Sequence, residues 1–328
     1  MSASDTPSRR KADVSLIVTV LNEADTIGDL LRSIAAQTVR PREVIVVDGG
    51  SRDGTQLHAE WWHGRLGTPL RVIDAPGAGI GAGRNTGIRA ATSPLIAVTD
   101  AGVVLAPDWL AHLVAPFADA DIAVVSGWFM PDAHTTFETA MGATVLPALS
   151  DIRPERFLPS SRSIAFRKVA WEAVSGYPEW LDYGEDLVFD LALQDAGARF
   201  AFAPEAVAYF RPRTSLRTFW HQYFRYARGD GKAGLWTRRH LIRYATYIAA
   251  LALIAAGKRG RPLWPIAALA AFAYVRRPFA RVIANSRNMT RVERIQAAAL
   301  VPLIRLIGDA AKMAGYPVGL VWRWHHHR

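Results

Sequence analysis

Short apolar runs alternate with helical patterns along the first hundred residues. Strands are predicted at residues 14–20, 43–48, 70–74 and 94–100. The clearest helix has four apolar residues on one face, namely Ile27, Leu30, Leu31 and Ile34. Further helices are expected at residues 56–66 and 84–91. Strands alternating with helices predict an α/β fold, with a mostly parallel sheet flanked by helices and right-handed crossovers.

The pattern continues less regularly after residue 100. A helix is expected to end near Phe117, and strands are predicted at residues 122–126 and 163–166. A short helix follows at 168–174, and a longer one opens at Gly184-Glu185-Asp186. Residues 127–160 carry few signals and are expected to form a loop-rich insertion.

Two apolar runs near the C-terminus, residues 241–257 and 262–275, flank the basic loop 258–261. The first has about 17 residues, the lower limit for crossing a bilayer, and the second about 14. Complete spans would place the basic loop outside, against the positive-inside rule. A hairpin in or on the cytoplasmic leaflet fits the charges better, and two short spanning helices are the alternative. Residues 295–324 are typical of an interfacial helix or of one that covers the protein.

Charge divides the chain into an acidic and a basic part. The net charge is +10, but residues 211–328 carry 22 Lys/Arg against three Asp/Glu. These basic residues bracket apolar runs, which favours anionic lipid over nucleic acid as a partner. The chain has no cysteine, so disulfides and thiolate metal sites are excluded. Residues 1–12 are expected to be a disordered tail, and the terminal histidines a solvated end rather than a metal site.

Two aspartates end predicted strands. Asp48 and Asp100 should lie at the same edge of the sheet, where α/β proteins bind ligands. A carboxylate there could anchor Mg²⁺ or Mn²⁺ bound to a phosphate. The run Gly77-x-Gly79-x-x-Ala82 loosely imitates a dinucleotide-binding fingerprint. However, two strand–helix units precede it, whereas that fingerprint normally lies on the first.

Six motifs in a fixed order resemble family 2 glycosyltransferases of the GT-A fold. They are Thr19-Val-Leu-Asn22-Glu23, Val47-Asp48-Gly-Gly-Ser51-Arg52-Asp53-Gly54-Thr55, Arg84-Asn85-Thr86-Gly87, Thr99-Asp100-Ala-Gly102, Gly184-Glu185-Asp186 and Gln222-Tyr-Phe-Arg225-Tyr226. The resemblance covers some two thirds of the chain. It implies a GT-A (Rossmann-like) catalytic domain at residues 13–230, and the apolar runs with their basic flanks predict a membrane-associated helical region at 231–328. It also implies an inverting hexosyltransferase-like enzyme that uses a nucleotide-diphospho-sugar.

The resemblance assigns the donor site to the first three motifs. Thr19 and Glu23 would lie near the base and ribose, and Asp48 would accept a hydrogen bond from the base. Helix or turn capping is the structural alternative for Glu23 and Asp48. Arg84 and Asn85 would face the diphosphate, whereas the alternative for Arg84 is a surface arginine.

Asp100 would hold the metal ion by the same resemblance. The family commonly has Asp-x-Asp, whereas this chain has Gly102 at the second position. Either Asp100, the diphosphate and water hold the ion, or metal dependence is reduced and Arg84 neutralises the phosphates.

The resemblance places the catalytic base at Asp186, which would take the proton of the acceptor hydroxyl. Glu185 would bind or orient the acceptor, and the alternative is that both acids only complement the helix dipole. Gln222, Arg225 and Tyr226 resemble the Gln-x-x-Arg-Trp motif of membrane polysaccharide synthases. Arg225 would meet the diphosphate, while Gln222 and Tyr226 would contact the acceptor, unless they are only surface residues of an amphipathic helix.

The acceptor class stays open. A glycan, a lipid-linked sugar or a polyprenyl phosphate are all compatible with a protein on the cytoplasmic face of the cell membrane. One transfer per acceptor is expected rather than processive synthesis. A catalytically impaired nucleotide-sugar-binding scaffold at the membrane is the alternative, because Gly102 replaces a carboxylate.

Overall fold

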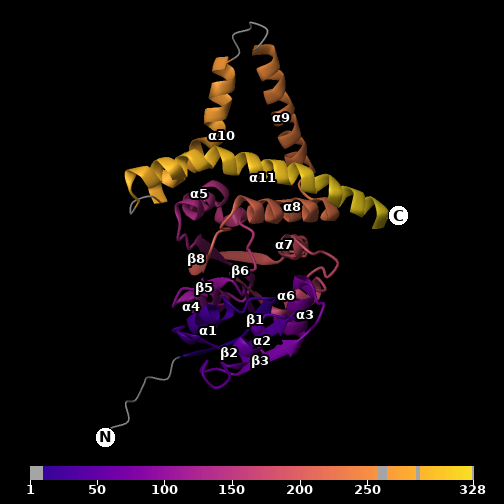
Figure 1. Cartoon of the computed structure of the whole chain (residues 1–328). Coiled ribbons are helices and arrows are strands. Elements are labelled where there is room, and N and C mark those ends of the chain that lie inside the picture. Colours follow the sequence, from indigo (N-terminus) through magenta and orange to yellow (C-terminus); the bar gives the residue numbers. More distant parts are fainter. Residues whose placement is uncertain (1–9, 258–263, 286–288, 327–328) are drawn as a thin grey trace. The chain divides into compact units, whose positions relative to one another are not determined.

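The computed structural model describes residues 10–257, 264–285 and 289–326 (Figure 1). Contacts divide the chain into two compact units. The first contains the residues up to 130 and residues 152–210, and the second contains residues 131–151 and 211–328. This division differs from the predicted boundary at residue 230, because helix α8 (Leu216–Ala233) runs across that residue. The limits of the catalytic domain stay a prediction.

An eight-stranded sheet forms the centre of the first unit, in the order β3-β2-β1-β4-β7-β6-β8-β5. The strands are β1 (Lys11–Val20), β2 (Arg40–Asp48), β3 (Leu70–Asp74), β4 (Leu95–Asp100), β5 (Val103–Leu105), β6 (Ile122–Pro131), β7 (Ile164–Arg167) and β8 (Arg199–Phe210). Strands β1 to β4 pair in parallel, whereas β7 pairs antiparallel with β4 and β6. The predicted α/β class is confirmed, and β1 to β4 supply its parallel part.

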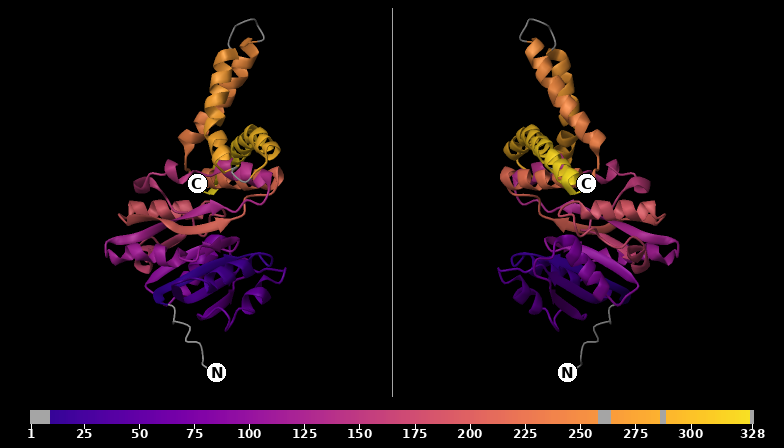
Figure 2. Two further views of the ribbon diagram at one scale, coloured as in Figure 1. Left: turned by 90° about the vertical axis from the view of Figure 1, so that its left-hand side faces the viewer. Right: turned by 90° about the vertical axis from the view of Figure 1, so that its right-hand side faces the viewer.

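Helices cover both faces of this sheet (Figures 1 and 2). They are α1 (Ile27–Ala35), α2 (Thr55–Glu60), α3 (Ile80–Ala90), α4 (Trp109–Val114), α6 (Lys168–Ala173) and α7 (Glu185–Asp195). The apolar face predicted for α1 is fully buried. Helix α3 packs very close to β1, since a Cβ at Gly87 would lie 2.6 Å from Ile17 Cγ2. Earlier in α3, a Cβ at Gly83 would lie 3.1 Å from Cγ2 of Thr19, near the carboxyl end of β1.

Two predicted irregular segments are ordered instead. Lys11 and Ala12 pair with Arg40 and Pro41 of β2, so the prediction of a disordered tail is wrong at residues 10–12. Residues 1–9 lie outside the described part of the chain. The insertion predicted at 127–160 contains the end of β6 and helix α5 (Thr136–Val145). A capping box of Thr135 and Glu138 begins that helix.

Helices make up most of the second unit. Helix α8 packs along α11 (Arg291–His326), and α9 (Thr237–Gly257) and α10 (Trp264–Asn285) rise from them as a pair (Figure 1). The close packing of α8 and α11 needs glycine, because a Cβ at Gly319 would lie 2.1 Å from the carbonyl oxygen of Arg228.

The apolar runs of the tail lie within α9 and α10, and the third segment lies within α11. Across the described residues, α9 alone is long and apolar enough to cross a membrane, and 6% of its most apolar window is buried. The basic loop 258–261 lies outside the described residues, as do the last two residues of the chain.

Candidate active site

Strand register brings the predicted carboxylates to one edge of the sheet. Val20 of β1 lies opposite Asp48 of β2, and Thr19 lies opposite Asp100 of β4. Thr19 therefore lies between the two strands that end in these aspartates. The carboxyl ends of three parallel strands form the edge that the sequence indicated as the ligand site.

Asp48 organises the turn that follows β2. The Oδ1 atom of this buried side chain accepts hydrogen bonds from the backbone N–H of Gly50 (3.1 Å) and Ser51 (2.9 Å). The hydroxyl of Ser51 donates to the same oxygen at 2.7 Å. Gly50 has φ +98°, which favours glycine. The turn alternative is therefore realised in the structure, and contact between Asp48 and a base stays a prediction.

Glu23 lies in a loop that is tied to the loop after β2. Its side chain accepts a hydrogen bond from the Thr26 hydroxyl, and its backbone N–H donates to Thr55 Oγ1 at 2.8 Å. The carboxylate of Asp53 accepts from the backbone N–H of Ala24 at 3.1 Å. These bonds hold the loops after β1 and β2 together, and a contact between Glu23 and ribose stays a prediction.

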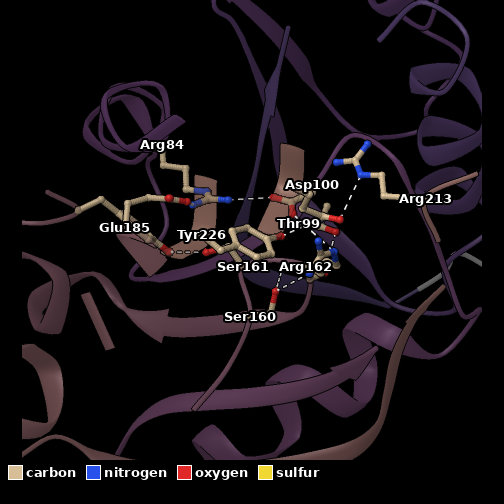
Figure 3. Close-up of polar contacts among 11 residues, drawn as sticks. Arg84, Thr99, Asp100, Ser160, Ser161, Arg162, Glu185, Arg213 and Tyr226 are labelled. Atoms are coloured by element: carbon tan, nitrogen blue, oxygen red, sulfur yellow. Dashed lines mark hydrogen bonds and ion pairs between the residues drawn. The ribbon is translucent and has the colours of Figure 1, made fainter. Parts of the chain in front are cut away.

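Arg84 joins two carboxylates that are far apart in the sequence (Figure 3). Its guanidinium donates to Asp100 Oδ1 at 2.8 Å and to Glu185 Oε1 at 2.5 Å. The side chain is 1% exposed, so the surface alternative is wrong. Burial alone would lower the pKa of Arg84, but Glu185 and Asp100 hold it above its usual value. Arg84 thus carries a fixed positive charge at the sheet edge.

Asn85 uses its side-chain amide inside the protein. Its Nδ2 donates to the carbonyl oxygen of Tyr177 (2.8 Å) and to Glu179 Oε1 (2.9 Å). Its Oδ1 accepts from the Trp171 indole (3.0 Å) and from the backbone N–H of Tyr177 (2.9 Å). Asn85 therefore fastens the segment before α7 to α3. A contact with the diphosphate would require some of these bonds to break.

The first turn of α7 holds the predicted catalytic pair. Gly184, with φ +83°, precedes the helix, so Glu185 and Asp186 are its first residues. Glu185 is buried against Arg84, whereas Asp186 is partly exposed. Burial raises the pKa of Glu185 to about 7, although Arg84 opposes the shift. The two acids have different environments: Glu185 supports Arg84, and Asp186 is the more accessible to a substrate.

One turn further along α7 lies a carboxyl group that the sequence did not single out. Asp190 is 1% exposed, and neither of its carboxyl oxygens has a hydrogen-bond partner among the described residues. Burial raises its pKa well above the usual value, with a further contribution from Asp186. Asp190 is therefore a buried acid with a raised pKa, four residues along α7 from the predicted base.

Arg162 is a second guanidinium beside Asp100 and was missed by the sequence motifs (Figure 3). Its Nε lies 3.9 Å from Asp100 Oδ2, and its Cζ lies 4.7 Å from the centre of the Phe210 ring. The hydroxyl of Thr99 donates to the backbone carbonyl of Arg162 at 2.8 Å. Antiparallel pairing of β7 with β4 places this arginine there, and no local pattern predicts that pairing.

The residues around Asp100 fit a metal ion only under one condition. No group of three His, Cys, Asp or Glu side chains in the described chain could hold an ion by itself. Asp100 is 29% exposed, and Gly102 leaves open space where a side chain would stand. Mg²⁺ often takes most of its ligands from phosphates and water. One carboxylate therefore fits an ion that arrives with a diphosphate.

The remaining predicted residues lie on α8 of the second unit. The side-chain amide of Gln222 donates to the hydroxyl of Tyr226 at 2.9 Å, one helical turn away. Gln222 also accepts from Arg213 at 3.3 Å. Arg225 is exposed on the same helix. Contacts of Gln222, Arg225 and Tyr226 with a donor or acceptor stay predictions.

Comparison with known proteins identifies the family of this chain. A family model described as glycosyl transferase family 2 matches residues 15–171. A second, described as glycosyl transferase family group 2, matches residues 95–304, which is more than half of the chain. The chain belongs to the family 2 glycosyltransferases.

Individual relatives are more distant. The glycosyltransferase AglE of Haloferax volcanii is 28% identical over 199 residues, which are 59% of this chain and 65% of the relative. The pre-mycofactocin glycosyltransferase of Mycobacterium tuberculosis is 30% identical over 230 residues, which are 64% of this chain and 45% of the relative. The chain thus spans less than two thirds of each of these curated relatives.

A solved structure supports the fold over nearly the whole chain. The mannosyltransferase PcManGT from Pyrobaculum calidifontis, in complex with GDP-Man and Mn²⁺, aligns with a TM-score of 0.53 at 20% identity. The alignment covers 98% of this chain and 89% of that protein. The predicted GT-A architecture is confirmed by this likeness, which shows the fold alone.

Proposed function

We propose that the protein transfers a sugar from a nucleotide-diphospho-sugar to an acceptor hydroxyl or phosphate, with inversion at the anomeric carbon. The observation that carries the proposal is the buried Arg84, which joins Asp100 to Glu185 at the carboxyl edge of parallel strands. A cation fixed at this edge suits a diphosphate, which carries the charge of the leaving group. Thr19, Glu23 and Asp48 would contact the nucleoside at the same edge.

Charge neutralisation at the diphosphate is assigned to Asp100 together with two arginines. Asp100 would hold Mg²⁺ or Mn²⁺, which stabilises negative charge on phosphate oxygens when bound. Arg162, whose side chain is 23% exposed, would contact the phosphates, and the buried Arg84 would add its positive charge beside Asp100. The Mn²⁺ and GDP-Man in the PcManGT complex support a divalent ion and a nucleotide sugar for this chain.

Asp186 is proposed as the base. In the transfer, the acceptor oxygen forms a bond to the anomeric carbon, and the bond to the diphosphate breaks with its electron pair. The acceptor proton passes to Asp186 when the acceptor is a hydroxyl. Partial exposure at the first turn of α7 suits this role better than the buried position of Glu185. Glu185 would instead orient Arg84.

The site of action is proposed to be the cytoplasmic face of a membrane. The exposed apolar side chains of α9, including Ile248 and Leu251 at 67% exposure each, support contact with lipid. A lipid-linked sugar or polyprenyl phosphate would be presented at such a surface, and a soluble glycan would reach it from the cytoplasm. Nucleic acid is not an expected partner, because the basic residues accompany apolar ones.

Asp186→Asn tests the proposed reaction, with Asp195→Asn at the exposed end of α7 as the matched control. Donor turnover should fall by about 10²–10⁴-fold in Asp186→Asn, while stabilisation by the nucleotide diphosphate is retained. The control should keep the wild-type rate. Full activity in Asp186→Asn would overturn the assignment of the base. A wild-type protein that binds nucleotides but turns over no nucleotide sugar would favour the scaffold alternative.

A further inference from the structure

Three helices of the second unit, α9, α10 and α11, meet at Asp309 of α11. The Oδ1 atom of Asp309 accepts from Arg243 Nε of α9 at 2.9 Å. Its Oδ2 accepts from the hydroxyls of Tyr247 of α9, at 3.2 Å, and of Tyr274 of α10. Lys312 of α11 lies 4.0 Å from Oδ1. We call these residues, together with Arg305 and Tyr223, the Asp309 cluster.

Positive charge exceeds negative charge in the Asp309 cluster. Arg243 and Lys312 lie beside the one carboxylate of the cluster, and Arg305 lies over the ring of Tyr274, which bonds that carboxylate. The pKa of Lys312 is lowered to about 8, chiefly by burial; Asp309 opposes this shift, and Arg243 and Arg305 contribute to it. A second carboxylate that acts on Lys312, Asp230 of α8, is hydrogen-bonded to His240. An added anion would therefore be stabilised here.

The donors of the cluster are only partly used. The Nε of Arg305 is buried and has no hydrogen-bond partner among the described residues. The ammonium of Lys312 lies over the ring of Tyr223 at 4.8 Å, and the guanidinium of Arg305 lies over Tyr274 at 4.3 Å. The side chains of Arg243 and Lys312 are 19% and 29% exposed, so the cluster is not sealed. A ligand with several acceptor oxygens could use these donors.

The helices that rise from the cluster have exposed apolar surfaces and lack acidic residues. α9 and α10 contain no Asp or Glu, and each contains three arginines. Their exposed apolar residues include Ile248 and Leu251 on α9 and Leu269 and Phe272 on α10. α11 crosses the lower ends of this pair (Figure 1), and its Asp309 is bonded to Arg243 of α9 and Tyr274 of α10. A pair of apolar helices next to the cationic Asp309 cluster suits an anionic membrane, which has an apolar interior and negatively charged headgroups.

We propose that the Asp309 cluster binds the phosphate of an anionic membrane lipid headgroup. Guanidinium, ammonium and tyrosine hydroxyl groups are the donors that suit phosphate oxygens. A lipid is favoured over free phosphate because α9 and α10, which contribute to the Asp309 cluster, also have exposed apolar side chains. A purely structural network around Asp309 would account for the hydrogen bonds of one carboxylate but not for the excess of cations.

The test compares two variants of the full chain that each lose two positive charges. One is Arg305→Gln with Lys312→Gln, and the control is Arg276→Gln with Arg277→Gln, two exposed arginines of α10. Flotation with vesicles of phosphatidylcholine, alone or mixed equally with phosphatidylglycerol, measures the affinity gained from the anionic lipid. In the cluster variant, the ratio of the affinities for the two kinds of vesicle should fall at least about tenfold, which corresponds to about 1.4 kcal/mol. In the control, this ratio should fall clearly less. Equal losses in both variants would overturn the proposal.

Two further measurements guard against misfolding and against free phosphate as the source. Lys312→Arg keeps the charge and should keep the gain from phosphatidylglycerol. In the wild-type protein, acetylation of Lys312 should be slowed more by phosphatidylglycerol vesicles than by phosphatidylcholine vesicles, relative to Lys232. If phosphatidylglycerol and phosphatidylcholine vesicles slow the acetylation of Lys312 equally, the proposal is contradicted, even if the variants misfold. Equal protection by inorganic phosphate without vesicles would overturn the assignment to a lipid.

Discussion

Arg84 of α3 and Asp100 of β4 form an ion pair of 2.8 Å at the carboxyl edge of the sheet. The guanidinium also holds Glu185 of α7, 101 residues away in the sequence. One buried cation therefore links the predicted metal ligand to the helix whose first turn contains the predicted base. A change at Arg84 should affect both the stability of the fold and the binding of the donor.

Arg84→Met should destabilise the protein by about 3–5 kcal/mol, because two carboxylates lose their buried partner. Arg89→Met is the matched control on the same helix. Arg89 pairs with Glu179, and both side chains are about half exposed, so the loss there should be about 0–1 kcal/mol. Urea unfolding of both variants measures the difference. Similar losses would show that the Arg84 network contributes little to stability.

Asp100→Asn should remove the stimulation of turnover by Mn²⁺ or Mg²⁺. The carboxylate charge that attracts a divalent ion is lost, while the positive charges of Arg84 and Arg162 remain at the site. Initial rates over a range of Mn²⁺ concentrations measure the effect, with Asp74→Asn at the exposed end of β3 as control. A wild-type rate that does not change on chelation of metal would instead support neutralisation of the diphosphate by arginine alone.

The stability of the first unit should fall as pH rises from 4.5 to about 7. Glu185 ionises near 4.5 when unfolded and near 7 when folded, so the folded state binds more protons in this interval. In Glu185→Gln, the loss of unfolding free energy over this pH interval should be smaller by about 1–3 kcal/mol. The raised pKa of Asp190 acts in the same direction, so Asp190→Asn should reduce this loss as well. Unfolding midpoints in urea at pH 5 and pH 8 provide the comparison; an unchanged slope in both variants would contradict the buried-acid explanation.

Gly319→Ala should destabilise the second unit by about 1–3 kcal/mol. The new Cβ at position 319 would lie 2.1 Å from the backbone oxygen of Arg228. The clash is with helix backbone, so the two helices would have to move apart. Gly28→Ala in α1 has nothing within 4 Å of the new Cβ and should be neutral or stabilising by up to about 1 kcal/mol. Thermal unfolding of both variants should give shifts of opposite sign or clearly different size. Equal shifts would show that α8 and α11 tolerate a wider spacing.

Local pattern determined much of the first unit. Alternation of β-branched runs with helical spacing determined the parallel strands β1 to β4, since burial on both faces leaves a strong apolar signal. The burial of Ile27, Leu30, Leu31 and Ile34 followed from their spacing alone. The motifs determined the family and the edge of the sheet at which Asp48 and Asp100 lie.

Other features depended on contacts between distant segments. Tertiary structure decided that Arg84 is buried between two carboxylates, that Arg162 lies beside Asp100, and that Asn85 is used internally. It also decided the antiparallel pairing of β7 with β4 and β6, and the meeting of α9, α10 and α11 at Asp309. The periodicity of a chain reports which face of an element is buried, because burial follows local spacing. The partner of a buried charge is determined by the packing of elements that are far apart in the sequence. Local residue spacing therefore does not predict that partner.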